Sequence, residues 1–191
     1  VVSRSGAKEN DLIITTGDLG AAYMGLQILE REKSIYNTNP KIQPDLDGHD
    51  YIIGRQLKPE ARNDIILDLK KMNVKPTSMI DISDGLASEI IHLCKSSNVG
   101  CNVYDEKIPI DSKTSMTAID FNLDPTTCAL NGGEDYELLF TINQSDFEKV
   151  KGNPNMTIIG HITNPNDGIY FIDKSGNQIE LKAQGWNHFN E

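Results

Sequence analysis

The sequence has 191 residues, which is enough for one domain with its own hydrophobic core. Hydrophobic residues make up 38% and charged residues 24%, and no apolar run approaches the ~20 residues that a membrane-spanning helix needs. Acidic residues outnumber basic ones 28 to 18, and the resulting net charge of −10 argues against non-specific binding to nucleic acid. We therefore expect a globular protein with neither a nucleic-acid partner nor a membrane partner.

Hydrophobic periodicity predicts strands that alternate irregularly with helices along the chain. The expected strands cover 11–16, 78–82, 101–104, 136–142, 157–162, 168–172 and 178–181, and the expected helices cover 21–33, 60–72, 84–94, 112–121, 126–130 and 146–150. The segment 37–50 is rich in Asn, Pro, Asp and Gly, which predicts a surface loop. The late strands follow one another through short turns, and the last two should form a hairpin. This order favours an α+β fold, a layered α/β/α sandwich with a mixed, largely antiparallel sheet, over a doubly wound parallel fold.

The three cysteines, Cys94, Cys101 and Cys128, have no CxxC spacing. An odd number without such spacing argues against a disulfide framework and against a zinc site. We expect all three to be buried small apolar residues in a protein of the reducing cytoplasm.

The first candidate for chemistry is the segment Asp81-Ile82-Ser83-Asp84-Gly85, which joins a predicted strand to a predicted helix. Carboxylates at such a junction face the crevice where α/β folds bind ligands, and their oxygens suit Mg²⁺. Ser83 could contact a phosphate together with the backbone N–H groups of the helix start. The alternative interpretation is an ordinary capping group, with Ser83 or Asp84 as the N-cap and no metal.

The second candidate is the segment 131–140, in which Gly132 and Gly133 precede Glu134 and Asp135 at the mouth of an apolar strand. The glycines allow a left-handed turn or a close approach of the backbone to a ligand. The carboxylates could bind a cationic ring, a hydroxyl group or a metal. The alternative is a hairpin-like turn whose acids are solvated.

Two weaker candidates lie near the ends of the sequence. Arg4, within residues 3–8, could hold a phosphate with two hydrogen bonds, although a solvated, frayed chain end explains the isolated segment better. Trp186, within residues 185–189, could stack on a flat heteroaromatic ring, or it could pack the chain end against the core. The sequence contains no GxSxG, Walker-type or HExxH motif, and the four histidines show no paired metal spacing.

These segments, taken in order, resemble the C-terminal half of thiamine-monophosphate kinases over nearly the whole chain. The resemblance covers residues 3–8, the strand followed by Gly17-Asp18-Leu19-Gly20, and residues 81–86, 132–138 and 185–189. The segments 132–138 and 185–189 are the more specific ones. Asp-Ile-Ser-Asp-Gly recurs more widely among related ATP-using enzymes, including aminoimidazole-ribonucleotide synthetases and selenophosphate synthetases.

The resemblance implies that residues 1–191 are the C-terminal domain of a cytoplasmic two-domain enzyme. Its N-terminal domain, missing here, would carry further acidic metal ligands and build a homodimer interface. ATP and several Mg²⁺ ions would bind where the domains meet, so this half alone should be inactive. The implied roles are Mg²⁺ ligands for Asp81 and Asp84, contacts with ATP for Arg4 and Ser83, and contacts with thiamine monophosphate for Glu134 and Trp186. The loop 37–50 should lie away from this site.

Phosphoryl transfer needs positioning and charge neutralisation more than covalent chemistry from the protein. The sequence offers no clear general base, and the accepting phosphate oxygen is already ionised near neutral pH. We therefore expect direct in-line transfer to thiamine monophosphate. Two alternatives remain open at this stage. One is another ATP-using enzyme of the same superfamily, such as a cyclo-ligase, a selenophosphate-synthetase-like enzyme or a hydrogenase maturation factor, and the other is a non-catalytic binding module.

Overall fold

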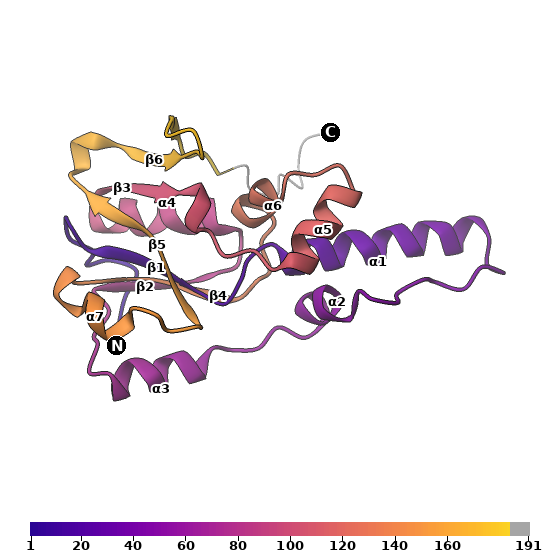
Figure 1. Cartoon of the computed structure of the whole chain (residues 1–191), viewed down its shortest axis with the longest axis horizontal. Coiled ribbons are helices and arrows are strands. Elements are labelled where there is room, and N and C mark those ends of the chain that lie inside the picture. The colour runs from indigo at the N-terminus through magenta and orange to yellow at the C-terminus, as the bar shows by residue number, and fades with distance from the viewer. Residues whose placement is uncertain (184–191) are drawn as a thin grey trace.

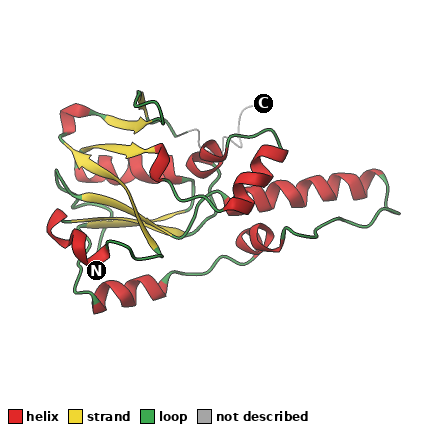
Figure 2. Cartoon of the chain, viewed as in Figure 1, coloured by secondary structure: helices red, strands yellow, loops and turns green. Residues whose placement is uncertain are grey.

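The computed structural model describes residues 1–183, which form one mixed sheet with helices around it (Figures 1 and 2). The strands of this part are β1 Leu12–Thr16, β2 Ser78–Ile82, β3 Gly100–Tyr104, β4 Glu137–Ile142, β5 Met156–Thr163, β6 Ile169–Ile172 and β7 Gln178–Glu180. Its α-helices are α1 Ala21–Thr38, α2 Asp50–Leu57, α3 Asn63–Lys71, α4 Leu86–Ser97, α5 Ser112–Asp120, α6 Pro125–Asn131 and α7 Phe147–Val150. Within residues 1–183, no helix is both long and apolar enough to cross a lipid bilayer.

The sheet has seven strands in the order β2-β4-β1-β5-β3-β6-β7. Every neighbouring pair is antiparallel except β3 and β6, which run parallel. The predicted mixed, largely antiparallel sheet and its final hairpin, β6 and β7, are therefore confirmed. Ile82 pairs with Glu137 at one end of the β2–β4 ladder. This register brings the end of β2 beside the beginning of β4, although 55 residues of sequence separate those two positions.

Two hydrophobic clusters cover the two faces of the sheet, because successive residues of a strand point to opposite sides. Ile13 belongs to one cluster and Ile14 to the other. The first cluster includes Leu86, Ile90 and Leu93 of α4, and the second includes Ile65 and Leu69 of α3. The sheet thus lies between helices on both faces, as the predicted α/β/α layers require.

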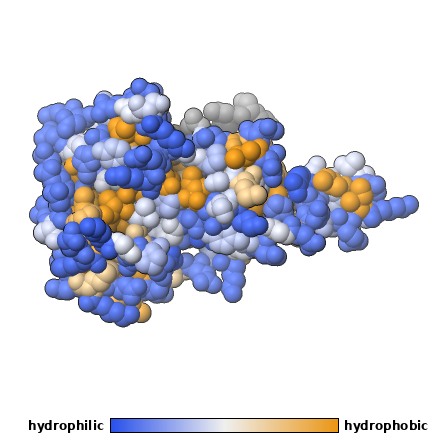
Figure 3. Space-filling model, viewed as in Figure 1, coloured by the Kyte–Doolittle hydropathy of each residue, from blue (hydrophilic) through white to orange (hydrophobic). Residues whose placement is uncertain are grey.

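A third hydrophobic cluster lies beyond one end of the sheet, where α1, α2, α5 and α6 pack together (Figure 1). Its buried members are Ala21, Met24 and Ile28 of α1, Ile52 of α2, Ala118 of α5 and Cys128 of α6. The molecule is therefore elongated, with α1 extending away from the sheet (Figure 1). On the face shown in Figure 3, hydrophilic residues dominate the surface, as the strong net charge leads us to expect.

The sequence prediction failed mainly in the segment between β1 and α3. Helix α1 runs to Thr38 instead of residue 33, and helix α2 was not predicted at all. The predicted loop is reduced to residues 39–49, nearly all of which are exposed. Helix α2 has only one fully buried residue, Ile52, so its eight residues carry too few apolar positions to show a helical period. The prediction for the cysteines is confirmed, since all three are buried and free.

Candidate functional site

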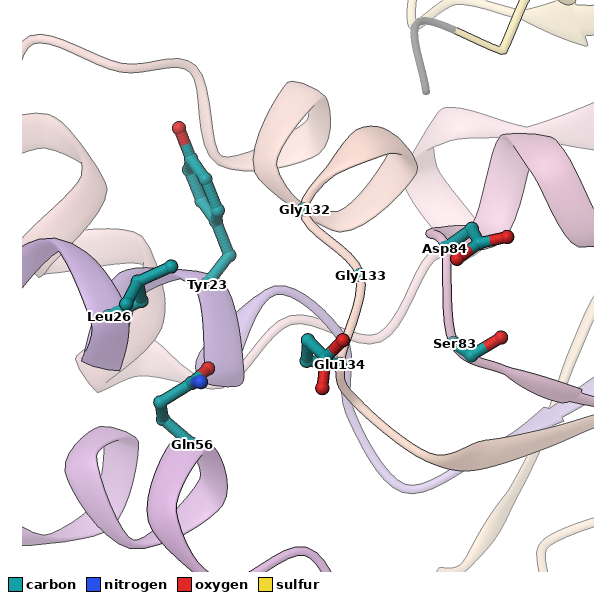
Figure 4. Close-up of a pocket in the computed structure, with 8 residues that line it drawn as sticks. All are labelled: Tyr23, Leu26, Gln56, Ser83, Asp84, Gly132, Gly133 and Glu134. Atoms are coloured by element: carbon teal, nitrogen blue, oxygen red, sulfur yellow. The ribbon is translucent and has the colours of Figure 1, made fainter. Parts of the chain in front are cut away.

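The candidate site is a cavity of about 520 Å³ at the edge where β2 ends and β4 begins (Figure 4). Helices α1 and α2 supply one wall, and the two segments predicted from the sequence supply the other. The lining residues are Tyr23, Leu26, Gln56, Ser83, Asp84, Gly132, Gly133 and Glu134. Ser83, Asp84 and Glu134, from the first and second sequence candidates, therefore share one cavity.

Backbone hydrogen bonds hold the two predicted segments together. The N–H of Glu134 donates to the carbonyl oxygen of Ser83 at 2.7 Å, and the N–H of Tyr136 donates to the carbonyl oxygen of Ile82 at 2.8 Å. Gly133 makes this approach possible: its φ is +70°, and a Cβ on it would lie 2.7 Å from the Ser83 oxygen. Glu134 itself has φ +62°, a left-handed conformation that non-glycine residues adopt at a cost of about 1–3 kcal/mol. The Glu134 side chain is exposed, so it is free to meet a ligand.

The carboxylate of Glu134 pairs with the hydroxyl group of Tyr136. That hydroxyl donates a hydrogen bond to Glu134 at 3.1 Å, and this bond is the main reason that the pKa of Tyr136 is raised. The negative charges of Glu134, Asp81 and Asp84 raise it further. Asp81 is exposed on β2 and does not line the cavity.

The N-cap prediction for the segment 81–85 is wrong. Gly85, with φ +108°, occupies the N-cap position of α4, and neither Ser83 nor Asp84 caps the helix with its side chain. Instead the buried carboxylate of Glu89 accepts hydrogen bonds from the backbone N–H of Asp84 at 3.0 Å and from the Ser83 hydroxyl at 3.4 Å. The side chain of Asp84 is consequently not used in capping, and it stays exposed at the cavity.

The carboxylates of Asp81 and Asp84 fit a Mg²⁺ ion only in combination with other ligands. Residues 1–183 contain no group of three or more His, Cys, Asp or Glu side chains that could hold a metal ion. In nucleotide-dependent enzymes Mg²⁺ is commonly bound through one or two carboxylates together with phosphates and water. Asp81 and Asp84 can provide those carboxylates, and the phosphates of a bound nucleotide can provide further oxygens.

The two weaker sequence candidates have different outcomes. Arg4 is exposed and does not line the cavity. Its segment is held against the protein, because Ser3 accepts a hydrogen bond from the Met79 N–H at 2.9 Å, beside the edge strand β2. Trp186, with the rest of 185–189, lies outside the described residues.

Sequence reasoning missed a second group of polar residues, which we call the Arg55 cluster. It consists of Asp18, Tyr51, Arg55, Arg62, Asp135 and Glu137, and most of it borders a second cavity of about 540 Å³. Arg55 donates to the Glu137 carboxylate at 3.0 Å and to the carbonyl oxygens of Asp18 and Asp135 at 3.2 Å. Arg62 donates to the other Glu137 oxygen at 2.5 Å. The cluster thus ties α2 and the residues before α3 to the start of β4.

The acids of the segment 134–137 have separate roles. Glu134 is exposed, whereas Asp135 and Glu137 are buried and bonded inside the protein. Asp135 accepts hydrogen bonds from the backbone N–H groups of Gly20 and Ala22, at the start of α1. Burial raises the pKa of Asp135 to about 7, although these hydrogen bonds and the charge of Arg55 oppose the rise. Neither sequence alternative, a shared ligand site or a turn with solvated acids, describes all three residues.

Only some residues of the Arg55 cluster belong to segments that the sequence analysis had singled out. Asp18, Asp135 and Glu137 belong to segments that were singled out, and their wide separation in the chain concealed that they meet. Tyr51 and Arg55 lie on α2, for which no helix was predicted. Burial of Tyr51 and its hydrogen bond to Asp18 raise the pKa of the tyrosine, and burial likewise raises the pKa of Asp18.

Comparison with known proteins identifies the relatives of this chain. No family model matches it. It is 34% identical over 190 residues to a thiamine-monophosphate kinase of Aquifex aeolicus, covering 98% of this chain and 55% of that protein. It is 33% identical over 196 residues to the thiamine-monophosphate kinase of Escherichia coli K12, again covering 98% and 55%. The chain is a homologue of thiamine-monophosphate kinases. It spans about half the length of the curated relatives that it matches.

Solved structures of thiamine-monophosphate kinases agree with this assignment. The structure of AaThiL complexed with AMPPCP and TMP matches 98% of this chain and 54% of its own chain, with a TM-score of 0.79 and 30% identity. The enzyme from Stenotrophomonas maltophilia K279a matches with a TM-score of 0.74 and 26% identity, over 95% of this chain and 54% of its own. The hydrogenase maturation protein HypE of E. coli shares the fold alone, at 12% identity and a TM-score of 0.66. These likenesses show that the chain shares its fold with thiamine-monophosphate kinases and with HypE.

Proposed function

We propose that this chain forms part of an enzyme that transfers a phosphoryl group from ATP to thiamine monophosphate. The observation that carries the proposal is the single cavity lined by Ser83, Asp84 and Glu134, in a homologue of thiamine-monophosphate kinases. A related structure is complexed with AMPPCP, an ATP analogue, and with TMP, which supports a site for two phosphorylated ligands.

The proposed roles separate the residues that bind Mg²⁺ and ATP from those that bind thiamine monophosphate. Asp81 and Asp84 hold Mg²⁺, while Ser83 and Arg4 contact ATP. Glu134, on the adjoining loop, contacts thiamine monophosphate together with Trp186. An acidic protein can bind two anionic ligands in this way only if cations lie between them, and Mg²⁺ when bound would neutralise charge on the phosphates.

The residues of the chain contribute positioning in this proposal. Ser83 and Glu134 are held at a fixed separation by the backbone hydrogen bond between them, so the ligands that they contact would approach each other in a defined orientation. The phosphate oxygen that accepts the phosphoryl group is already ionised, so no side chain has to remove a proton. We accordingly propose direct in-line transfer, and a phosphorylated enzyme trapped during turnover would rule it out.

In this proposal residues 1–191 are one C-terminal domain of a cytoplasmic two-domain enzyme. The N-terminal domain would supply further acidic metal ligands and a homodimer interface, so this chain alone would be inactive. The remaining 45% of the relatives' length is ample for such a domain.

The test is steady-state kinetics of the full-length protein with ATP, Mg²⁺ and thiamine monophosphate. Asp84→Asn should lower kcat by ~10²-fold, because the site loses a carboxylate that binds the cation, and added Mg²⁺ should restore part of the activity. The matched control is Asp120→Asn, since Asp120 is exposed on α5 and lies away from the cavity lining.

Three results would contradict the proposal. In the first, Asp84→Asn turns over as fast as the wild type. In the second, the wild type consumes ATP with a different acceptor and ignores thiamine monophosphate, which would favour another enzyme of the same superfamily. A protein that binds these ligands without any turnover would instead be a binding module.

A further inference from the structure

The side chain of Gln56 has a buried hydrogen-bond acceptor that no residue in the described part of the chain satisfies. Gln56 lies on α2 and lines the cavity together with Glu134 (Figure 4). Its amide oxygen is buried, yet it has no hydrogen-bond partner within residues 1–183. Buried polar groups in proteins are nearly always paired, so an exception in a ligand cavity calls for an explanation.

The position of Gln56 is fixed by close packing between α1 and α2. A Cβ on Gly25 of α1 would lie only 2.1 Å from the carbonyl oxygen of Ile52 and 3.1 Å from the Cβ of Gln56. The absence of a side chain at Gly25 therefore lets α2 approach α1 closely. On its other side α2 is anchored by Arg55, which donates to Asp18, Asp135 and Glu137. The backbone of Gln56 is thus rigidly held, while the terminal torsion of its amide can still turn toward a ligand.

The chemistry around Gln56 favours a flat ring that carries N–H donors. The Gln56 oxygen and the Glu134 carboxylate are both acceptors, and Tyr23 and Leu26 of α1 add an aromatic and an apolar surface to the same cavity. An amino-substituted pyrimidine ring combines the required features, namely an exocyclic N–H donor and two faces that pack on such surfaces.

We propose that Gln56 is a specificity-determining residue that accepts a hydrogen bond from the exocyclic amino group of an aminopyrimidine ring bound in this cavity. The inference rests on the proposed function, in which both substrates contain such a ring: thiamine monophosphate has an aminopyrimidine, and adenine has a fused one. The ring of thiamine monophosphate is the expected occupant, because Glu134, the proposed contact of that substrate, lines the same cavity.

The experiment compares ligands in which oxygen replaces the amino group. Binding and kcat/KM of the full-length protein are measured for thiamine monophosphate against oxythiamine monophosphate, and for ATP against ITP. Sites that hydrogen-bond a ligand group reject analogues lacking it by large factors, so the wild type should prefer thiamine monophosphate by ~10²–10⁴-fold. Gln56→Leu should lower kcat/KM for thiamine monophosphate by ~10–100-fold and change the value for oxythiamine monophosphate much less.

Two further variants separate this role from a structural one. Gln56→Glu keeps an acceptor oxygen, so it should retain most of the discrimination that Gln56→Leu loses. Gln178→Leu makes the same exchange at an exposed position of β7. It should leave the preference for thiamine monophosphate over oxythiamine monophosphate, and for ATP over ITP, unchanged.

The outcomes distinguish the two proposals. A loss of discrimination between ATP and ITP, with the thiamine ratio intact, would assign Gln56 to the adenine ring. If Gln56→Leu keeps the wild-type preference within both ligand pairs, the inference about Gln56 is overturned, while the proposed kinase function is unaffected. A wild type that neither binds nor phosphorylates thiamine monophosphate would refute the proposed function, and the ATP and ITP binding data would still decide the role of Gln56.

Discussion

Replacing Arg55 by methionine should lower the free energy of unfolding by ~2–3 kcal/mol. Arg55 donates three hydrogen bonds, to Glu137 at 3.0 Å and to the carbonyl oxygens of Asp18 and Asp135 at 3.2 Å. Breaking a fully buried ion pair by removing one partner costs about 3–5 kcal/mol. We expect less here, because the Arg55 side chain is 20% exposed and Glu137 keeps its bonds to Arg62 and Thr16.

Urea and thermal unfolding of the purified protein measure this change. For a protein of this size each kcal/mol shifts Tm by roughly 2–4 °C, so Arg55→Met should lower Tm by about 4–12 °C. The matched control is Arg4→Met, because Arg4 is exposed and should contribute less than ~0.5 kcal/mol to stability.

A double-mutant cycle with Glu137→Gln tests whether the loss comes from this contact. Residues within one ion-pair network usually show a coupling energy of about 0.5–3 kcal/mol. Strict additivity of the two substitutions would refute the assigned pairing. So would an Arg55→Met protein as stable as the Arg4→Met control.

Two other changes probe the site. Burial raises the pKa of Asp135 to about 7 from 3.8, so the stability contributed by its protonated form is fully present below 3.8 and is lost as the pH rises through about 7. The free energy of unfolding of the wild type relative to Asp135→Asn, from urea titrations, should therefore fall by up to ~4 kcal/mol between about pH 4 and about pH 8. If the two proteins instead show parallel curves of stability against pH, the raised pKa of Asp135 is contradicted. Gly133→Ala should lower the free energy of unfolding by ~1–3 kcal/mol, since the new Cβ would lie 2.7 Å from the Ser83 oxygen and φ is +70°. The control is Gly54→Ala on α2, where a Cβ meets no atom within 4 Å; equal stability of the two variants would disprove the strain.

The sequence was most informative where apolar residues follow a regular period. The strands and most helices were predicted to within a few residues, because burial on one or both faces imposes that period. Helix α2 was missed because it contributes one buried residue and otherwise depends on Gly25 and the Arg55 cluster for its place. These are contacts between segments, and no local pattern records them.

The motifs at 81–84 and 132–137 were likewise recognised from the sequence. The sequence did not predict which of their acidic side chains are buried and which are exposed. Asp135 and Glu137 are buried, whereas Glu134 is exposed. The cause is the left-handed backbone conformation of Glu134 and Tyr136, which redirects the chain just before β4. The carboxylate of Glu89 bonds to Ser83 and to Asp84, which the local capping rule did not foresee.

Local sequence therefore determined most of the elements, the α+β class and several of the segments that carry polar chemistry. Tertiary structure alone decided which of those segments meet, through the pairing of Ile82 with Glu137 and the close approach of α2 to α1. The physical reason is that hydrophobic periodicity is a property of neighbouring residues, whereas a cavity is formed by side chains brought together from distant parts of the chain. Gln56 illustrates the difference: nothing in its sequence neighbourhood distinguishes it, and only the assembled cavity shows that its amide oxygen has no partner within residues 1–183.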